Sequence, residues 1–293
     1  MTRKLTFTDF AAGFLRLVRV QNLLIVVLMQ YLARVFLVGA TGAWPGNWRS
    51  QLSDPKLLIL SLSTVCIAAA GYIINDYFDI KIDIVNKPER VVIGRYLKRR
   101  WAIGLHQILN GLGCLGGLYL SRWVFLVNVL SATLLWFYSA HFKRQPFIGN
   151  VIVGFLTALS LLVLAVYYRQ NWDLVLIYAT FSFVITLVRE VIKDMEDVRG
   201  DERFGCRTLP IIWGIRRTKI FLYVLIASFI ATLFLIADLL NNRHLDVIFL
   251  VMLVPITWLV YRLVYADTKR DFNFLSQLCK IIMLMGVLSM IWV

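Results

Sequence analysis

The chain has 293 residues, of which 60% are hydrophobic and only 16% charged, and its formal net charge is +14. Soluble domains are about half apolar and a quarter charged, so this composition excludes an ordinary soluble protein. It indicates a single membrane-embedded domain spanning residues 1–293. The basic residues occupy short segments between apolar stretches, which favours membrane topology and contact with lipids over nucleic-acid binding as the origin of the charge.

Long apolar stretches recur along the whole chain. A helix needs roughly 20 apolar residues to cross the hydrocarbon core, and nine stretches meet that need. The sequence therefore predicts an all-α, polytopic membrane protein of about nine transmembrane helices enclosing a central apolar cavity. The predicted spans are 14–38, 57–78, 103–120, 123–140, 148–168, 172–190, 218–239, 246–265 and 275–293.

Two of these spans are predicted to form a tight pair. Only Ser121 and Arg122 separate 103–120 from 123–140, which indicates a helical hairpin. Glycines let helix backbones approach closely in membranes, so the glycines of the first span predict close packing there. These are Gly111, Gly113, Gly116 and Gly117.

The distribution of Lys and Arg orients the spans. With the N-terminus inside, the inner segments 1–13, 79–102, 141–147, 189–219 and 266–272 hold most of the basic residues. This follows the positive-inside rule. We expect a multi-pass protein of the cell inner membrane, with the two long inner segments, 79–102 and 189–219, facing the cytoplasm.

Each long inner segment is associated with the same pattern of carboxylates at the end of a span. Aspartates stand at relative positions 0, 3 and 7, which places them on one face of a helix. The two sets are Asp76, Asp79 and Asp83, and Asp194, Asp197 and Asp201. Stacked carboxylates repel one another, and Mg²⁺ compensates for such repulsion, held by one or two carboxylates together with substrate phosphates. The clusters are therefore predicted to bind Mg²⁺ and a diphosphate.

Three other interpretations compete with that one. Either cluster alone is compatible with a solvated, salt-bridged helix end, but identical spacing at two inner ends argues against this. A transporter for an anionic substrate typically places its coupling site near the bilayer midplane, whereas these carboxylates lie at one end. A CDP-alcohol phosphotransferase would carry an Asp-Gly-x-x-Ala-Arg segment, which the sequence lacks.

The two motifs resemble those of a known family. Asn75-Asp76-x-x-Asp79-x-x-x-Asp83 and Lys193-Asp194-x-x-Asp197-x-x-Gly200-Asp201 are similar to the signatures of the UbiA superfamily of intramembrane prenyltransferases. The segment from Tyr138 to Arg144, followed by Gly149-Asn150, and the pair Arg19 and Asn22 in the first span resemble further family features. The resemblance covers nearly the whole chain.

That resemblance implies a fold of about nine spans and a Mg²⁺-dependent prenyl transfer from a polyprenyl diphosphate to a lipophilic acceptor. It implies that the metal ligands are Asn75, Asp76, Asp79, Asp83, Asp194, Asp197 and Asp201, with Asp76 alternatively a support at the helix end. Tyr138 would guide the allylic cation or lie in an interfacial belt. The implied contacts to the substrates are Asn22, Arg90, Lys143, Arg144 and Lys193.

The stretch after the first cluster bears on the acceptor. Ile82-Asp83-x-x-Asn86-x-Pro88-x-Arg90 resembles both geranylgeranylglyceryl phosphate geranylgeranyltransferases and chlorophyll synthases, and Asn75-Asp76-Tyr77-Phe78-Asp79 leans towards the first. The sequence then departs from both branches, because Val91-Val92-Ile93-Gly94-Arg95 replaces their Pro-rich continuation. Aromatic or quinone-precursor acceptors and chlorophyllide-type acceptors stay open.

Overall fold

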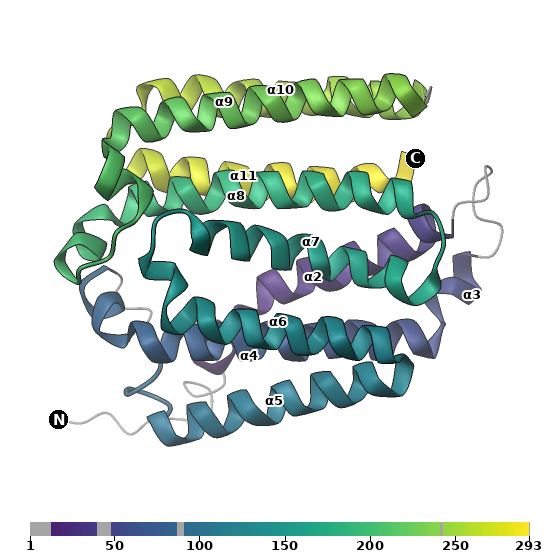
Figure 1. Cartoon of the computed structure of the whole chain (residues 1–293), viewed down its shortest axis with the longest axis horizontal. Coiled ribbons are helices and arrows are strands. Elements are labelled where there is room, and N and C mark those ends of the chain that lie inside the picture. The colour runs from purple at the N-terminus through teal and green to yellow at the C-terminus, as the bar shows by residue number, and fades with distance from the viewer. Residues whose placement is uncertain (1–12, 40–47, 87–90, 241–242, 293) are drawn as a thin grey trace. The chain divides into compact units, whose positions relative to one another are not determined.

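The computed structural model describes residues 13–39, 48–86, 91–240 and 243–292. These residues form helices, and the described part of the chain contains no strand (Figure 1). The all-α prediction is therefore confirmed. The α-helices are α2 (Val20–Leu32), α3 (Trp48–Leu52), α4 (Pro55–Asn86), α5 (Arg99–Leu120), α6 (Arg122–Ala140), α7 (Ile148–Tyr168), α8 (Trp172–Arg203), α9 (Leu209–Leu240), α10 (Arg243–Tyr265) and α11 (Lys269–Ser289). Short helical segments are η1 (Ala33–Val38), η3 (Phe142–Arg144) and η4 (Met290–Trp292).

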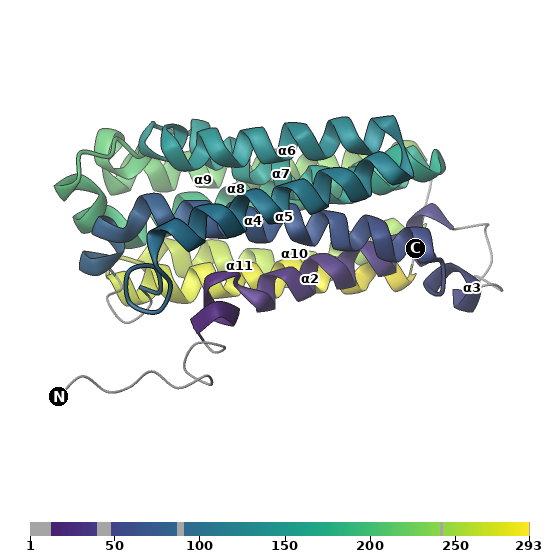
Figure 2. The same cartoon turned by 90° about the horizontal axis from the view of Figure 1, so that it is seen from below.

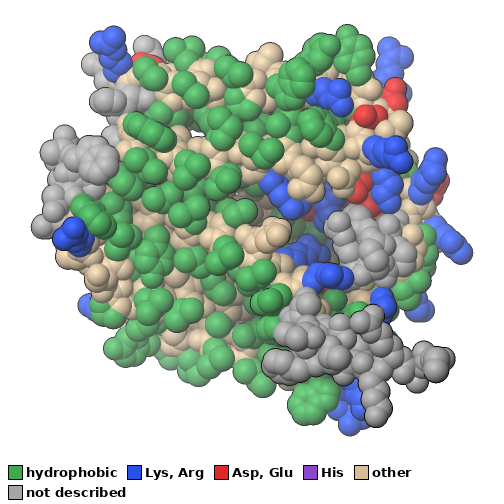
Figure 3. Space-filling view, turned by 180° about the vertical axis from the view of Figure 1, so that it is seen from behind, with side chains coloured by type: hydrophobic (Ala, Val, Ile, Leu, Met, Phe, Trp, Pro, Cys, Tyr) green, Lys and Arg blue, Asp and Glu red, His purple; other side chains and the backbone are tan. Residues whose placement is uncertain are grey.

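The predicted membrane spans correspond to these helices. In the described ranges, eight helices are long and apolar enough to cross a membrane. The remaining predicted span, 103–120, forms α5, whose 22 residues are enough to cross but include His106, Gln107 and Asn110 among the apolar ones. Hydrophobic side chains cover much of the face shown in Figure 3. Many leucine, valine and aromatic side chains are exposed, which suits a surface bounded by lipid.

The two helices that carry the carboxylate clusters are longer than their apolar stretches. Both α4 and α8 have 32 residues, a length of about 48 Å against a hydrocarbon core of about 30 Å. Each helix continues beyond the apolar span expected at 57–78 or 172–190 and runs through its charged cluster, which agrees with the placement of the aspartates on one helical face. The reason is that polar side chains, once beyond the hydrocarbon, do not interrupt the backbone hydrogen bonds of a helix.

The chain divides into two compact units. Unit 1 comprises Met1–Leu28 and Ser53–Phe142, and unit 2 comprises Met29–Leu52 and Lys143–Val293. The expectations of a single domain and of a central apolar cavity are not tested by the structure and stay predictions.

In unit 1, α4 packs against both α5 and α6, and α5 packs against α6. A Cβ atom built on Gly113 of α5 would lie 2.9 Å from the backbone oxygen of Ser63 in α4. The close helix packing predicted from the glycines is therefore confirmed at this position. Gly116 and Gly117 are similarly crowded, whereas Gly111 faces open space and does not serve this contact. The hairpin prediction is confirmed, since Ser121 ends α5 and caps α6 through its hydroxyl.

In unit 2, α8 is the central helix and packs against α7, α9 and α11, while α10 packs against α9 and α11. Figures 1 and 2 show α8 beside α11, and α9 beside α10. Val191 and Ile192 of α8 are fully buried in the apolar core of this unit. The carboxylate cluster thus lies at the end of a helix that is packed on three others, and this packing fixes the backbone that positions the carboxylates.

Candidate functional site

The first carboxylate cluster occupies the last three turns of α4, in unit 1. Asn75, Asp76, Asp79 and Asp83 are all half-buried there. The side-chain oxygen Oδ1 of Asn75 is buried and has no hydrogen-bond partner. A buried polar oxygen without a partner costs free energy, and an amide oxygen is a ligand that hard divalent cations accept. Asn75 therefore fits the predicted role of a metal ligand.

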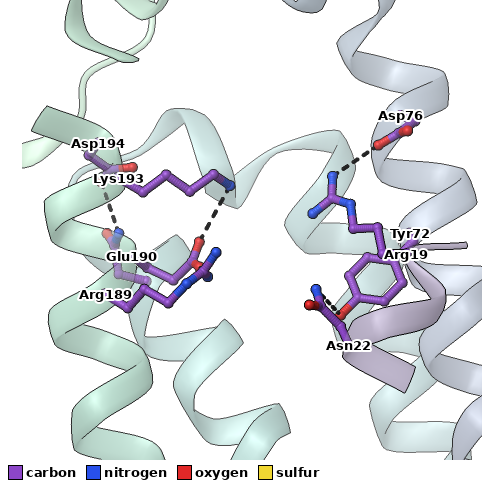
Figure 4. A network of polar contacts seen from close by, with 9 residues as sticks. Arg19, Asn22, Tyr72, Asp76, Arg189, Glu190, Lys193 and Asp194 are labelled. Carbon is purple, nitrogen blue, oxygen red and sulfur yellow. Dashed lines mark hydrogen bonds and ion pairs between the residues drawn. The ribbon is translucent and has the colours of Figure 1, made fainter. Parts of the chain in front are cut away.

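Asp76 is engaged by a cation from another part of unit 1. The Nη2 atom of Arg19 lies 3.1 Å from Oδ1 of Asp76. The Arg19 guanidinium also lies over the ring of Tyr72, 4.9 Å from its centroid. The side-chain amide of Asn22 donates a hydrogen bond of 3.3 Å to the Tyr72 hydroxyl. Figure 4 shows these four side chains converging next to α4. Of the two roles considered for Asp76, the contacts support the one in which it anchors the helix end.

The second cluster occupies the last three turns of α8, in unit 2. Asp194, Asp197 and Asp201 are half-buried on one face of this helix. The Nδ2 atom of Asn150, a buried residue of α7, donates a hydrogen bond of 2.8 Å to Oδ2 of Asp194. Hydrogen bonds to a charged acceptor are about twice as strong as neutral ones. Asn150 therefore fixes the rotamer of the first carboxylate in the cluster.

Two cations precede Asp194 on α8, Lys193 directly before it and Arg189 five residues before it. The Nζ atom of Lys193 lies 3.9 Å from Oε2 of Glu190, and Nη1 of Arg189 contacts Oε1 of the same carboxylate (Figure 4). The Nε atom of Arg189 is buried and makes no hydrogen bond. Glu190 lies four residues before Asp194 and so extends the acidic face of α8 by one turn. The second cluster thus combines carboxylates with two closely held positive charges.

The remaining predicted site residues are more dispersed. Tyr138 is half-buried near the end of α6, in unit 1. Lys143 and Arg144 lie in η3 and belong to unit 2, where the carbonyl oxygen of Arg144 accepts a 2.8 Å hydrogen bond from the backbone N–H of Arg207. This bond joins η3 to the segment that follows α8. Arg90 lies outside the described residues.

The donor chemistry of both clusters fits Mg²⁺. Each supplies carboxylate oxygens at helical spacing, and the first adds the buried oxygen of Asn75. Among the described residues, no three His, Cys, Asp or Glu side chains converge as a preformed metal site. Mg²⁺ typically keeps several waters and completes its coordination shell with substrate phosphates rather than binding in an all-protein cage.

Sequence reasoning assigned no role to three residues that lie near the clusters, one in unit 1 and two in unit 2. Tyr72 and Glu190 each lie four residues before the first aspartate of a cluster, an offset that a search of the shared helical face would have found. Asn150 entered the sequence analysis only as part of a resembling segment. Its contact with Asp194 joins residues 44 positions apart, and no local pattern reveals it.

A family model and several proteins of known sequence or structure match this chain. The model of the UbiA prenyltransferase family matches residues 21–285. Digeranylgeranylglyceryl phosphate synthase of Methanothermobacter thermautotrophicus is 36% identical over 204 residues, which cover 69% of this chain and 69% of that protein. The enzyme of the same name from Metallosphaera sedula is 31% identical over 268 residues, covering 88% of this chain and 87% of its own length.

Solved structures agree with the fold. A structure of digeranylgeranylglyceryl phosphate synthase matches with a TM-score of 0.74 at 25% identity, covering 97% of this chain and 98% of its own. A UbiA homolog from Archaeoglobus fulgidus, bound to GPP and Mg²⁺, matches with a TM-score of 0.66 at 15% identity, covering 95% of this chain and 99% of its own.

Proposed function

Because the chain belongs to the UbiA prenyltransferase family, we propose that it transfers a geranylgeranyl group from its diphosphate to the free hydroxyl of geranylgeranylglyceryl phosphate. The observation that carries this proposal is the repeated aspartate cluster at the ends of α4 and α8, together with 31% identity to a digeranylgeranylglyceryl phosphate synthase over 88% of the chain. The identical spacing in two long helices is what a site for a metal-bound diphosphate needs.

The residues that would hold Mg²⁺ are Asn75, Asp79 and Asp83 in α4 and Asp194, Asp197 and Asp201 in α8. When bound, Mg²⁺ would stabilise the negative charge that develops on the departing diphosphate. Support comes from the unpartnered oxygen of Asn75 and from the Mg²⁺ bound with GPP in the Archaeoglobus fulgidus homolog. Asp76 is left out of this set because Arg19 already neutralises it.

The chain's own cations would complete the neutralisation. Lys193 and Arg189, each paired with Glu190, and the basic residues of η3 are available to contact diphosphate oxygens. In the reaction the allylic C–O bond to diphosphate breaks, and an ether C–O bond forms with the acceptor hydroxyl, which loses its proton. Apolar side chains around the prenyl tail would exclude the water that competes for an allylic cation. Tyr138 is proposed to offer its ring face to that cation.

We further propose that the reaction takes place at the cytoplasmic face of the cell inner membrane. The ends of α4 and α8 that carry the clusters adjoin the basic segments that the positive-inside rule places inside. Lipophilic donor and acceptor would reach the protein from the bilayer.

The experiment is prenyl transfer by the purified chain in nanodiscs, with geranylgeranyl diphosphate, Mg²⁺ and a panel of acceptors, read by mass spectrometry. The panel holds geranylgeranylglyceryl phosphate, 4-hydroxybenzoate, 1,4-dihydroxy-2-naphthoate and a chlorophyllide. We expect a Mg²⁺-dependent product with the phosphorylated lipid alone. A product with an aromatic acceptor or the chlorophyllide instead would overturn the proposed acceptor. Folded protein that neither forms a product nor binds geranylgeranyl diphosphate with Mg²⁺ would overturn the enzyme and favour an anion transporter.

A further inference from the structure

Each aspartate cluster is preceded, one helical turn earlier on the same face, by a residue that holds an arginine. In α8 this residue is Glu190, which contacts Arg189 and stands four residues before Asp194. In α4 the matching position is Tyr72, four residues before Asp76. An arginine lies over its aromatic ring, at 4.9 Å from the centroid. The same helical position thus binds a cation in both units, by a carboxylate in one and by an aromatic face in the other.

The arginine held by Tyr72 has an unusual backbone. Arg19 has φ = 51°, in the left-handed region that residues with a Cβ rarely enter. Its carbonyl oxygen accepts a 2.8 Å hydrogen bond from the N–H of Asn22, and its own N–H donates to the carbonyl of Arg16. Such strained residues persist where the surrounding contacts over-determine them, and they concentrate at functional sites. Here the strained residue is Arg19, whose Nη2 atom lies 3.1 Å from Oδ1 of Asp76 in the first motif.

We propose that Tyr72 is a positioning residue for prenyl transfer. The Tyr72 ring orients the Arg19 guanidinium (Figure 4). The Tyr72 hydroxyl accepts a hydrogen bond from Asn22, and this bond fixes the position of the ring. Held in this way, Arg19 neutralises Asp76 and keeps it from competing as a metal ligand. Asn75, Asp79 and Asp83 then bind the metal with one less negative charge beside the incoming diphosphate. The inference rests on the proposed function.

The two parts of Tyr72 contribute unequally. A partly desolvated cation–π contact is equivalent to a factor of roughly 5–30 in an equilibrium constant. The hydroxyl contact with Asn22 is long, at 3.3 Å, and neutral, so it contributes about a factor of two. Tyr72→Leu removes both contacts, whereas Tyr72→Phe keeps the ring and removes only the second. The role therefore predicts a graded series rather than an all-or-none loss.

The experiment measures Mg²⁺-dependent binding of geranylgeranyl diphosphate to the full-length protein in nanodiscs, alongside KM, kcat and the unfolding temperature. We expect Tyr72→Leu to weaken binding about tenfold and Tyr72→Phe about twofold, with most of the kinetic effect in the donor KM. In an Asp76→Asn background the same Tyr72→Leu change should weaken binding less than about twofold, because Tyr72 acts through a pair that is already broken. Where Asp76→Asn does not accumulate as folded protein, Arg19→Gln serves as the second background.

A matched control is Tyr168→Leu. The ring of Tyr168, in unit 2, also holds an arginine, because the Arg34 guanidinium lies over it at 4.0 Å from the centroid, and Tyr168 is not part of either aspartate motif. We expect this variant to lower the unfolding temperature about as much as Tyr72→Leu and to leave donor binding unchanged. Two results would overturn the positioning role alone. One is that Tyr72→Leu still weakens donor binding tenfold when Asp76→Asn, or its substitute Arg19→Gln, is already present. The other is that Tyr72→Leu does not weaken donor binding in the otherwise wild-type protein. Wild-type protein that binds no donor with Mg²⁺ overturns the proposed function as well.

Discussion

Removing the amide of Asn150 should weaken metal-dependent donor binding. Its Nδ2 atom donates a 2.8 Å hydrogen bond to Asp194, and the side chain is buried, with 7% of its surface exposed. A hydrogen bond to a charged group contributes about 1.5–3 kcal/mol, and about 1.4 kcal/mol corresponds to tenfold in an equilibrium constant. In Asn150→Ala the carboxylate of Asp194 loses both its orientation and this stabilisation of its ionised form. We expect the Mg²⁺ concentration for half-maximal donor binding to rise at least tenfold.

The assay is a Mg²⁺ titration of geranylgeranyl diphosphate binding, with Asn273→Ala as the matched control. Asn273 donates a 3.1 Å hydrogen bond to Glu196, which is also on α8 but on the side opposite the aspartate face. Both variants remove one amide-to-carboxylate bond, so we expect similar losses in unfolding temperature. Only Asn150→Ala should shift the Mg²⁺ midpoint. An equal shift in both variants, or none in Asn150→Ala, would refute the reasoning that Asp194 binds the metal.

Two further predictions concern stability and are read as unfolding temperatures in detergent. Gly113→Ala should destabilise the protein by about 1–3 kcal/mol, because its Cβ would meet the Ser63 backbone at 2.9 Å. Gly111→Ala, on the same helix but facing open space, should be neutral or stabilising, and equal losses in the two would contradict the packing of α4 on α5. Asn171→Ala should cost about 1–3 kcal/mol, since Asn171 has φ = 48° and donates hydrogen bonds to the carbonyls at the end of η1. Asn171→Gly should cost less, because glycine adopts that backbone conformation without strain.

Much of the fold could be predicted because hydrophobicity in a membrane is read directly from the sequence. The span expected at 148–168 coincides with α7, where an apolar stretch ends in polar loops on both sides. The apolar stretch and the helix differ in length at the carboxylate clusters. Asp79, Lys81 and Asp83 lie beyond the predicted end at residue 78, yet α4 continues to Asn86. Hydropathy marks where a helix leaves the hydrocarbon core, and it carries no information on where the hydrogen-bonded backbone stops.

Some features of the candidate site could likewise be predicted from the sequence, and others could not. The spacing of Asp76, Asp79 and Asp83 is local, so helical periodicity was sufficient to place the three on one face. The ion pair on which we base the proposal that Asp76 is not a metal ligand is not local, because Arg19 and Asp76 are 57 residues apart. It also depends on a left-handed backbone at an arginine, which sequence propensity disfavours. Contacts that tertiary packing creates against local preference are the ones that one sequence does not reveal.

The central claim is that both aspartate clusters serve one Mg²⁺-dependent reaction. Its most direct test is geranylgeranyl transfer to geranylgeranylglyceryl phosphate by the variants Asp79→Ala and Asp197→Ala, each shown to be folded by its elution from a sizing column and its unfolding temperature. The account predicts that either substitution alone abolishes the product, and that chelation of Mg²⁺ abolishes it in the unsubstituted protein. Full activity in either folded variant would contradict the account.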